Sequence, residues 1–186
     1  MDYRHLRRRS KFICVALKLR IMPKIRRYFL KERDKKLLLG DFARVFQMDS
    51  ERFFESKPGI EAIETSKHKI YLINNTPLLA KSEEDLFPTL MFNEIFPFLP
   101  KIVVDMGAVP YVCNGADVMA PGIVSINGVF KKGDLVVVVD MKHGKPIAIG
   151  SALSDSESLK AIKQGKVFKN LHHVGDEVWN TIKNLA

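Results

Sequence analysis

The feature that most limits what this chain can fold into is a run of short apolar segments, cut by glycine, between residues 103 and 124. The run reads V-V-D-M-G-A-V-P-Y-V-C-N-G-A-D-V-M-A-P-G-I-V, with breaks at Gly107, Gly115 and Pro121-Gly122. Glycine lets the backbone take a positive φ or approach another surface closely, and Pro-Gly is a strong turn signal. The run therefore predicts a small structure of brief strands and tight turns with one short helix.

Further motifs follow this run in a fixed order. Gly-Asp stands at residues 133–134, a strongly apolar stretch runs from Leu135 to Val139, and Ile-Ala-Ile-Gly ends at Gly150. Together with Asp-x-Gly-Ala, Asn-Gly-Ala and Pro-Gly-Ile in the first run, these motifs resemble the PUA domain, a small RNA-binding β-barrel. A generic small barrel with tight turns is the alternative.

Motifs outside the barrel narrow the resemblance. Residues 87–90 (F-P-T-L), 95–100 (I-F-P-F-L-P) and 170–179 (N-L-H-H-V-G-D-E-V-W) look like the malignant T-cell-amplified sequence family, also called translation machinery-associated, and specifically an archaeal member. The resemblance implies an α+β fold, with a small α+β pre-PUA domain at residues 22–98 and a mostly β PUA pseudobarrel at residues 99–186. The apolar joint at residues 96–100 is expected to be packed rather than flexible.

The positive charge is concentrated at the N-terminus. Residues 1–36 carry 14 of the 30 lysines and arginines and three of the 21 acidic residues. Such a basic segment suits a phosphate backbone, and Arg26, Arg27, Lys35 and Lys36 form a candidate basic helix. A solvated helix face is the alternative. Residues 1–21 are a basic extension that is not native if translation begins at Met22.

Nothing in the sequence predicts secretion or a membrane span. The apolar stretch 12–17 follows three arginines like a signal peptide, but it is short, Lys18 and Arg20 close it, and no small-residue cleavage site follows. No apolar run approaches the ~18 residues that cross a bilayer. The two cysteines, Cys14 and Cys113, lie far apart and suit a reducing compartment. We expect a cytoplasmic protein.

The hydrophobic pattern before the barrel predicts helices around a small group of strands. A helix is expected from Lys24 to Phe46, with a break at Gly40-Asp41 where Asp41 would cap a second helix. A short helix is expected to open at Phe87 and to end at Pro97 or Pro100. The expected strands are 60–65 and 69–73, joined by a hairpin at 66–68, and 78–80 after a turn at 74–77.

The barrel is expected to contain short strands, most of them linked by turns. A hairpin is predicted at Asn127-Gly128, and a helix is predicted from about residue 154 to Gly165. The other expected elements are strands at 102–104, 117–119, 123–126, 135–141, 147–150 and 167–173, a short helix at 108–113 and a terminal helix from 175 to about 185.

The resemblance implies an RNA-binding face built on the glycine turns. Gly107 and Gly115 would let phosphate or ribose approach backbone N–H groups, the N-terminus of the helix at Ala108 suits phosphate, and Tyr111 can stack on a base. The alternatives are glycines that only satisfy turn geometry, a tyrosine that packs, and lysines that are merely solvated. The candidate RNA contacts are Met106, Gly107, Ala108, Val109, Tyr111, Asn114, Gly115, Ala116, Met119, Pro121, Gly122, Lys131, Lys132, Lys169 and His172, with charge also from Lys166.

The resemblance implies a non-enzymatic, monomeric RNA-binding protein of the translation apparatus. Its expected partners are tRNA at the acceptor end or rRNA, the small ribosomal subunit, and a protein with a SUI1-type domain. Residues 22–98 hold no phosphate-binding glycine loop and no catalytic Cys/His set, and we expect no cofactor or metal. The alternatives are an RNA-targeting module for a separate tRNA or rRNA modification enzyme, and a protein scaffold.

Overall fold

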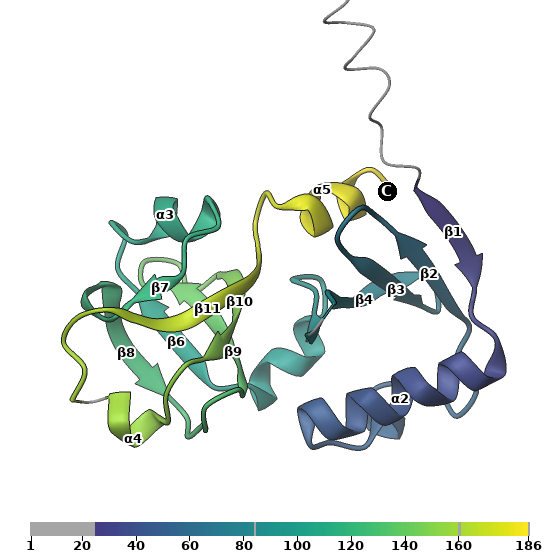
Figure 1. Cartoon of the computed structure of the whole chain (residues 1–186), viewed down its shortest axis with the longest axis horizontal. Helices are drawn as coiled ribbons and strands as arrows, with labels where there is room; N and C mark the ends of the chain where they lie inside the picture. The colour runs from purple at the N-terminus through teal and green to yellow at the C-terminus, as the bar shows by residue number, and fades with distance from the viewer. Residues whose placement is uncertain (1–24, 84, 160, 186) are drawn as a thin grey trace, which may run out of the picture.

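The chain folds into two antiparallel-rich sheets joined by a short helical segment (Figure 1). The computed structural model describes residues 25–83, 85–159 and 161–185, so the basic extension 1–21 lies outside the described residues. A five-stranded sheet with one long helix comes first, and a six-stranded sheet curled into a half-open barrel follows. The architecture is α+β, as predicted.

The first sheet has the order β1-β2-β3-β4-β5, and all its neighbours are antiparallel. The predicted hairpin at residues 66–68 joins β2 to β3. The next hairpin turns at Asn74 and Asn75, which both have positive φ, as two-residue turns between twisted strands require. The strands are β1 (Arg26–Phe29), β2 (Ile60–Glu64), β3 (Lys69–Ile73), β4 (Thr76–Lys81) and β5 (Leu86–Pro88).

Strand β1 corrects the helix predicted from Lys24. Arg26 and Arg27 are extended, with Arg26 opposite Glu64 and Arg27 opposite Ile63 of β2. The Arg27 guanidinium also lies 2.6 Å from the Glu61 carboxylate. Pairing with a distant strand therefore outweighs the weak helical preference of these residues.

Helix α2 (Glu32–Phe46) covers one face of this sheet and buries Leu38, Phe42 and Phe46 (Figure 1). The helix is continuous through Gly40, so the predicted break is wrong. Asp41 does not cap a helix; its carboxylate binds Lys81 at 3.0 Å and Arg44 at 2.6 Å. These cations, Lys81 first, hold the pKa of Asp41 below its usual value and tie the middle of α2 to β4.

The segment between the sheets differs from the helix predicted to open at Phe87. Residues 86–88 instead form β5, where Pro88 pairs with Leu79 at the edge of the sheet and its missing N–H costs no ladder bond. The helical turn η3 begins later and runs from Asn93 to Phe98. Near it, the short helix η2 (Ser50–Arg52) places the Arg52 guanidinium 4.2 Å from the centre of the Phe98 ring.

The second sheet has the order β7-β11-β10-β9-β6-β8, and only β6 and β9 are parallel. The hairpin predicted at Asn127-Gly128 is absent, because β6 lies between β8 and β9 and pairs with both. The apolar run predicted as a strand is β9, which is buried along its length. The strands are β6 (Lys101–Val104), β7 (Val118–Met119), β8 (Ile123–Asn127), β9 (Leu135–Asp140), β10 (Pro146–Ala152) and β11 (Lys166–His173).

Helix α4 (Ser156–Leu159) is much shorter than predicted. Two backbone bonds hold the chain on either side of it: the Leu153 N–H donates to the Val167 carbonyl at 2.9 Å, and the Ala120 N–H donates to the Gly165 carbonyl at 2.9 Å. These bonds return the chain to the sheet before a longer helix can form.

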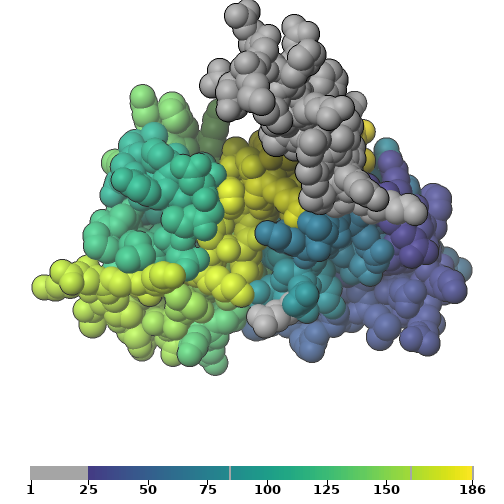
Figure 2. Space-filling view, turned by 45° about the horizontal axis from the view of Figure 1, so that its top comes forward, coloured from purple at the N-terminus to yellow at the C-terminus, as the bar shows by residue number. Residues whose placement is uncertain are grey.

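One hydrophobic cluster spans both sheets, and the barrel holds a second cluster of its own. Val137 and Val139 of the barrel lie in the same buried cluster as Ile95 and Phe96 of the joint and the core of the first sheet. The C-terminal helix α5 (Glu177–Lys183) crosses back and buries Val178 and Ile182 in this cluster. Figure 2 shows the yellow C-terminal residues between the barrel and the blue N-terminal region. The joint is packed, as the sequence predicts.

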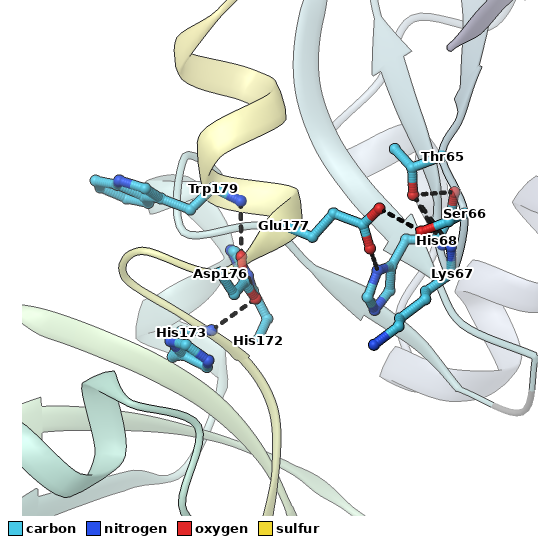
Figure 3. Close-up of polar contacts among 9 residues, drawn as sticks. All are labelled: Thr65, Ser66, Lys67, His68, His172, His173, Asp176, Glu177 and Trp179. Carbon is cyan, nitrogen blue, oxygen red and sulfur yellow. Dashed lines mark hydrogen bonds and ion pairs between the residues drawn. The ribbon is translucent and has the colours of Figure 1, made fainter. Parts of the chain in front are cut away.

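Two histidine–carboxylate pairs hold α5 in place (Figure 3). The His68 ring lies 3.2 Å from Glu177, which also accepts a bond from Ser66 at 2.9 Å. The His172 ring lies 2.7 Å from Asp176, the residue that caps α5. Burial alone would raise the pKa of both carboxyl groups, but the hydrogen bonds they accept outweigh burial and hold each pKa below its usual value.

Candidate nucleic-acid interface

A pocket of about 580 Å³ opens beside the short helix α3 (Val109–Cys113) of the barrel. Its walls come from α3, from β7, from the helical turn η4 (Ala120–Gly122) and from the turn at residues 105–108. Most of the predicted glycine-turn residues meet here. The lining residues are Asp105, Gly107, Ala108, Tyr111, Val112, Gly115, Ala116, Asp117, Val118, Met119, Pro121, Gly122 and Lys166.

Asp105 builds the turn that forms one wall. Its carboxylate accepts the Ala108 N–H at 2.7 Å, which stabilises the start of α3. Its own N–H donates to the Gly122 carbonyl at 3.0 Å, joining the turn to η4. A Cβ on Gly122 would lie 2.9 Å from the Ala108 Cβ, so only glycine lets these two walls meet.

Gly115 lines the pocket and also has a conformation that favours glycine. Its φ is +87°, which disfavours any residue with a Cβ, and it directly follows Asn114, the last residue of the α3 cap. A Cβ there would also lie 3.1 Å from the His173 ring. Gly107, by contrast, has no positive φ, and both glycines line the pocket.

The mouth of the pocket is apolar and accessible. Tyr111 is 70% exposed, which rules out the alternative that it packs, and Met106 and Met119 are also exposed. An exposed aromatic ring beside a concave, mostly apolar surface can stack on a flat ring. The arrangement suits an unpaired nucleobase better than a duplex, which has no free ring face except at its ends.

The lining also holds a carboxylate that the sequence did not assign to the site, Asp117, beside Lys166. Asp117 accepts the Asn170 N–H at 2.9 Å and lies 3.0 Å from the Lys166 ammonium. Burial would raise the pKa of Asp117, but these two donors outweigh it and lower the pKa. The Asn170 amide in turn donates to the carbonyls of Val112 and Ala116, each at 3.0 Å, and so fastens α3 to β11.

Three predicted contacts, Met106, Val109 and Asn114, border the pocket without lining it. Val109 is a partly buried residue of α3, and Asn114 is the exposed residue that ends the helix. Val112, Asp117 and Val118 line it and were missed. The signal that could have found them was position, since all three lie between or beside the glycine motifs.

Other predicted contacts lie elsewhere. Lys131 and Lys132 sit in the turn before β9, where their N–H groups donate to Asp134 and Asp155, and they do not line the pocket. Lys169 lies 3.1 Å from Asp85 of the first sheet, in the groove between the two sheets.

The structure corrects the RNA contact predicted at His172. Its side chain has no exposed surface, and its ring stacks on Phe87 at 6.1 Å while it binds Asp176. It cannot touch RNA in this conformation. Its role is to join β11, α5 and β5.

The candidate basic helix is also only partly present. Arg26 and Arg27 belong to β1, and Lys35 on α2 is paired with Glu32 at 2.8 Å. Lys36 is exposed on the same helix. Within the described residues, the four cations therefore do not lie together on one helix.

No side-chain set for metal or nucleophilic chemistry is found among the residues that the structure describes. These residues hold no group of three or more His, Cys, Asp or Glu arranged to bind a metal ion. Burial raises the pKa of the Cys113 thiol, which disfavours the reactive thiolate. Within the same residues, no helix has the length and apolar character to cross a bilayer.

Comparison with known proteins places two regions in described families. Residues 100–174 match the PUA domain, and residues 26–93 match a domain of unknown function, DUF1947. The division falls at the joint between the two sheets.

Some relatives match the chain over most of their length. An uncharacterized protein of Methanocaldococcus jannaschii is 38% identical over 156 residues, which are 83% of this chain and 96% of that protein. Translation machinery-associated protein 20 of Eremothecium gossypii is 30% identical over 154 residues, covering 78% and 84% of the two chains. The crystal structure of a hypothetical protein from Pyrococcus horikoshii has 32% identity and a TM-score of 0.71, covering 84% of this chain and 99% of that one.

Proposed function

Because the chain belongs to the PUA-domain family that includes translation machinery-associated protein 20, we propose that it binds an unpaired RNA end in the translation apparatus through the pocket beside α3. RNA binding in a translation context follows from the family.

The observation that carries the proposal is the exposed Tyr111 ring at the mouth of a mostly apolar pocket. Base stacking on aromatic side chains contributes about 1–3 kcal/mol per base and does not depend strongly on sequence. The volume of the pocket, about 580 Å³, leaves room for a nucleotide and not for a helix of paired bases. A single-stranded 3′ end, such as the acceptor end of tRNA, has the required shape.

The charges around the pocket also favour a nucleotide bound with its base inside. Lys166 at the edge of the pocket offers a cation to the phosphate next to the bound base. Asp105 and Asp117 would repel a phosphate, so we place the backbone at the mouth and the base inside. Donors on the base, such as an exocyclic amine, would meet these carboxylates.

The proposed role is binding without catalysis, in the cytoplasm, by a monomer. The pre-PUA domain at residues 22–98 would add contacts to the small ribosomal subunit or to a partner with a SUI1-type domain. The PUA domain at residues 99–186 would hold the RNA. Targeting of a separate RNA-modification enzyme is the alternative role for the same pocket.

Replacing Tyr111 with alanine tests the pocket. We expect the Y111A protein to bind tRNA about tenfold more weakly, from the loss of one stacking contact, with an unchanged melting temperature. The matched control is V129A, which removes an even more exposed side chain on another face of the barrel. Equal affinity in Y111A and wild type would remove the pocket from the RNA site.

A further inference from the structure

A second surface of the barrel differs in chemistry from the pocket beside α3. Within the part of the chain that the structure describes, strand β8 forms one edge of the six-stranded sheet and pairs on one side only, with β6. An edge strand presents backbone N–H and C=O groups that another extended segment can pair with.

A groove of about 610 Å³ runs along this edge. It is lined on one side by the consecutive residues Ile123, Val124, Ser125 and Ile126. Because successive side chains of a strand point to opposite faces, a groove that contacts four in a row follows the edge of the strand and not one of its faces. The opposite wall comes from α4, with Ser156, Glu157 and Leu159.

The edge lacks the protection that exposed strands usually carry. Residues 118–130 contain no charged side chain, although charged residues make up 27% of the chain. The edge strand of the other sheet, β1, carries Arg26 and Arg27. Around β8, Val124 is 52% exposed and Val129 is 86% exposed. An edge without charges is open to pairing with another chain.

The lining identifies the kind of occupant. Among the described residues that line the groove, Glu157 is the one charged side chain and none is a cation, so these residues offer no partner to the phosphates of an RNA backbone. An uncharged segment meets no penalty there. Helix α4 forms a wall of the groove, so the edge of a second barrel would bring its own α4 against that wall, whereas a single extended segment brings no such helix.

We propose that the groove between β8 and α4 binds an extended, uncharged segment of a partner protein, which adds a strand to the barrel beside β8. The backbone of the segment pairs with β8, and its apolar side chains contact Ile123, Ile126 and Leu159. The groove and the RNA pocket lie on either side of η4, so both are accessible in one molecule. This site is independent of the proposed RNA binding.

The test is an NMR titration of the whole isotope-labelled chain with an end-blocked peptide that has the sequence of residues 122–129, which is uncharged and rich in β-branched residues. We expect shift changes at the amides of residues 123–129 and 156–159 and slower hydrogen exchange along β8. The same peptide with proline in place of its serine lacks one N–H and should bind about tenfold more weakly, close to the net loss of one hydrogen bond.

Two matched variants of the chain complete the test. V124K places a charge on the edge, and M141K places one on an equally exposed side chain outside the groove. The peptide should bind about tenfold more weakly to V124K and unchanged to M141K.

Four results would overturn the proposal. They are no shift changes at millimolar peptide, equal binding of the proline peptide, a free chain that is already a dimer with β8 amides protected, and shift changes at β8 on adding oligouridylate in place of the peptide.

Discussion

The two sheets differ in the charges they carry and in the shape of their surfaces. The first sheet and its helix carry many cations, yet several are neutralised within the fold, as in Arg27–Glu61, Lys35–Glu32 and Lys81–Asp41. The barrel pocket has one lining cation, Lys166, itself paired with Asp117, but it exposes an aromatic ring beside a hollow surface. Net charge in the sequence therefore marks a different region from the one whose shape suits a nucleobase.

The difference separates two contributions to RNA binding. Cations add affinity that depends on salt and not on sequence, while a fitted pocket recognises a particular end of a strand. We expect the barrel to supply recognition and the first sheet to supply weaker, salt-dependent attraction. Each of the following experiments acts on one side of this division.

The largest effect is expected where the two regions meet. H172A removes a buried ring that binds Asp176 and stacks on Phe87, and it leaves a carboxylate poorly paired. We expect the free energy of unfolding to fall by about 3 kcal/mol, measured by denaturant titration. The control is H173A, the partly exposed neighbour in the same strand, which should cost less than about 1 kcal/mol. Equal losses in both variants would show that His172 does not join the regions.

The next largest effect belongs to the pocket. G107E adds a negative charge to the wall where a phosphate would pass. The glycine has no positive φ, and the Cβ of a side chain there would lie 3.1 Å from the Asp105 carboxylate, which must shift slightly. We expect affinity for tRNA to fall by more than about tenfold with the far-ultraviolet circular dichroism unchanged. Full affinity in a folded G107E protein would show that RNA does not approach this turn.

A structural element could be predicted from the sequence where neighbouring residues determine it, and could not where distant residues do. The barrel turns are specified locally by Gly107, Gly115 and Pro121-Gly122, so the pocket could be predicted from the sequence. The strand at Arg26–Phe29 could not, because it forms only by pairing with residues 61–64.

Long-range packing caused the other errors. The Asn127-Gly128 hairpin fails because β6, from earlier in the chain, inserts between the two strands. The sequence around His172 is that of an exposed strand residue, but in the structure its ring stacks on Phe87. Asp117 is held in the site by hydrogen bonds from Asn170 and Lys166, which lie more than 40 positions away in the sequence.

A smaller effect on stability is expected when the pH is lowered. The pKa of Asp176 is lowered in the folded state, so its carboxylate stabilises the fold above the unfolded pKa of about 3.9 and this contribution is lost as the pH falls through the folded value. Unfolding measured from pH 6 to pH 2 should lose stability more steeply in the wild type than in D176N. Identical slopes would mean that the contact between the regions does not titrate through Asp176.

The smallest effect is expected on the helix of the first sheet. K36Q removes one exposed cation of α2. We expect less than about a twofold loss in tRNA affinity and a salt dependence reduced by about one phosphate contact at most. A loss as large as that of G107E would reverse the division between the two regions.

The measurement that tests the division most directly is the affinity of the whole protein for tRNA with and without its single-stranded 3′ CCA end, across a series of salt concentrations. Recognition by the barrel pocket predicts tight binding that falls sharply on removing CCA, with a difference that persists at high salt. Weak binding that depends on salt alone and is unchanged by removing CCA would contradict the account and assign the RNA to the basic surface.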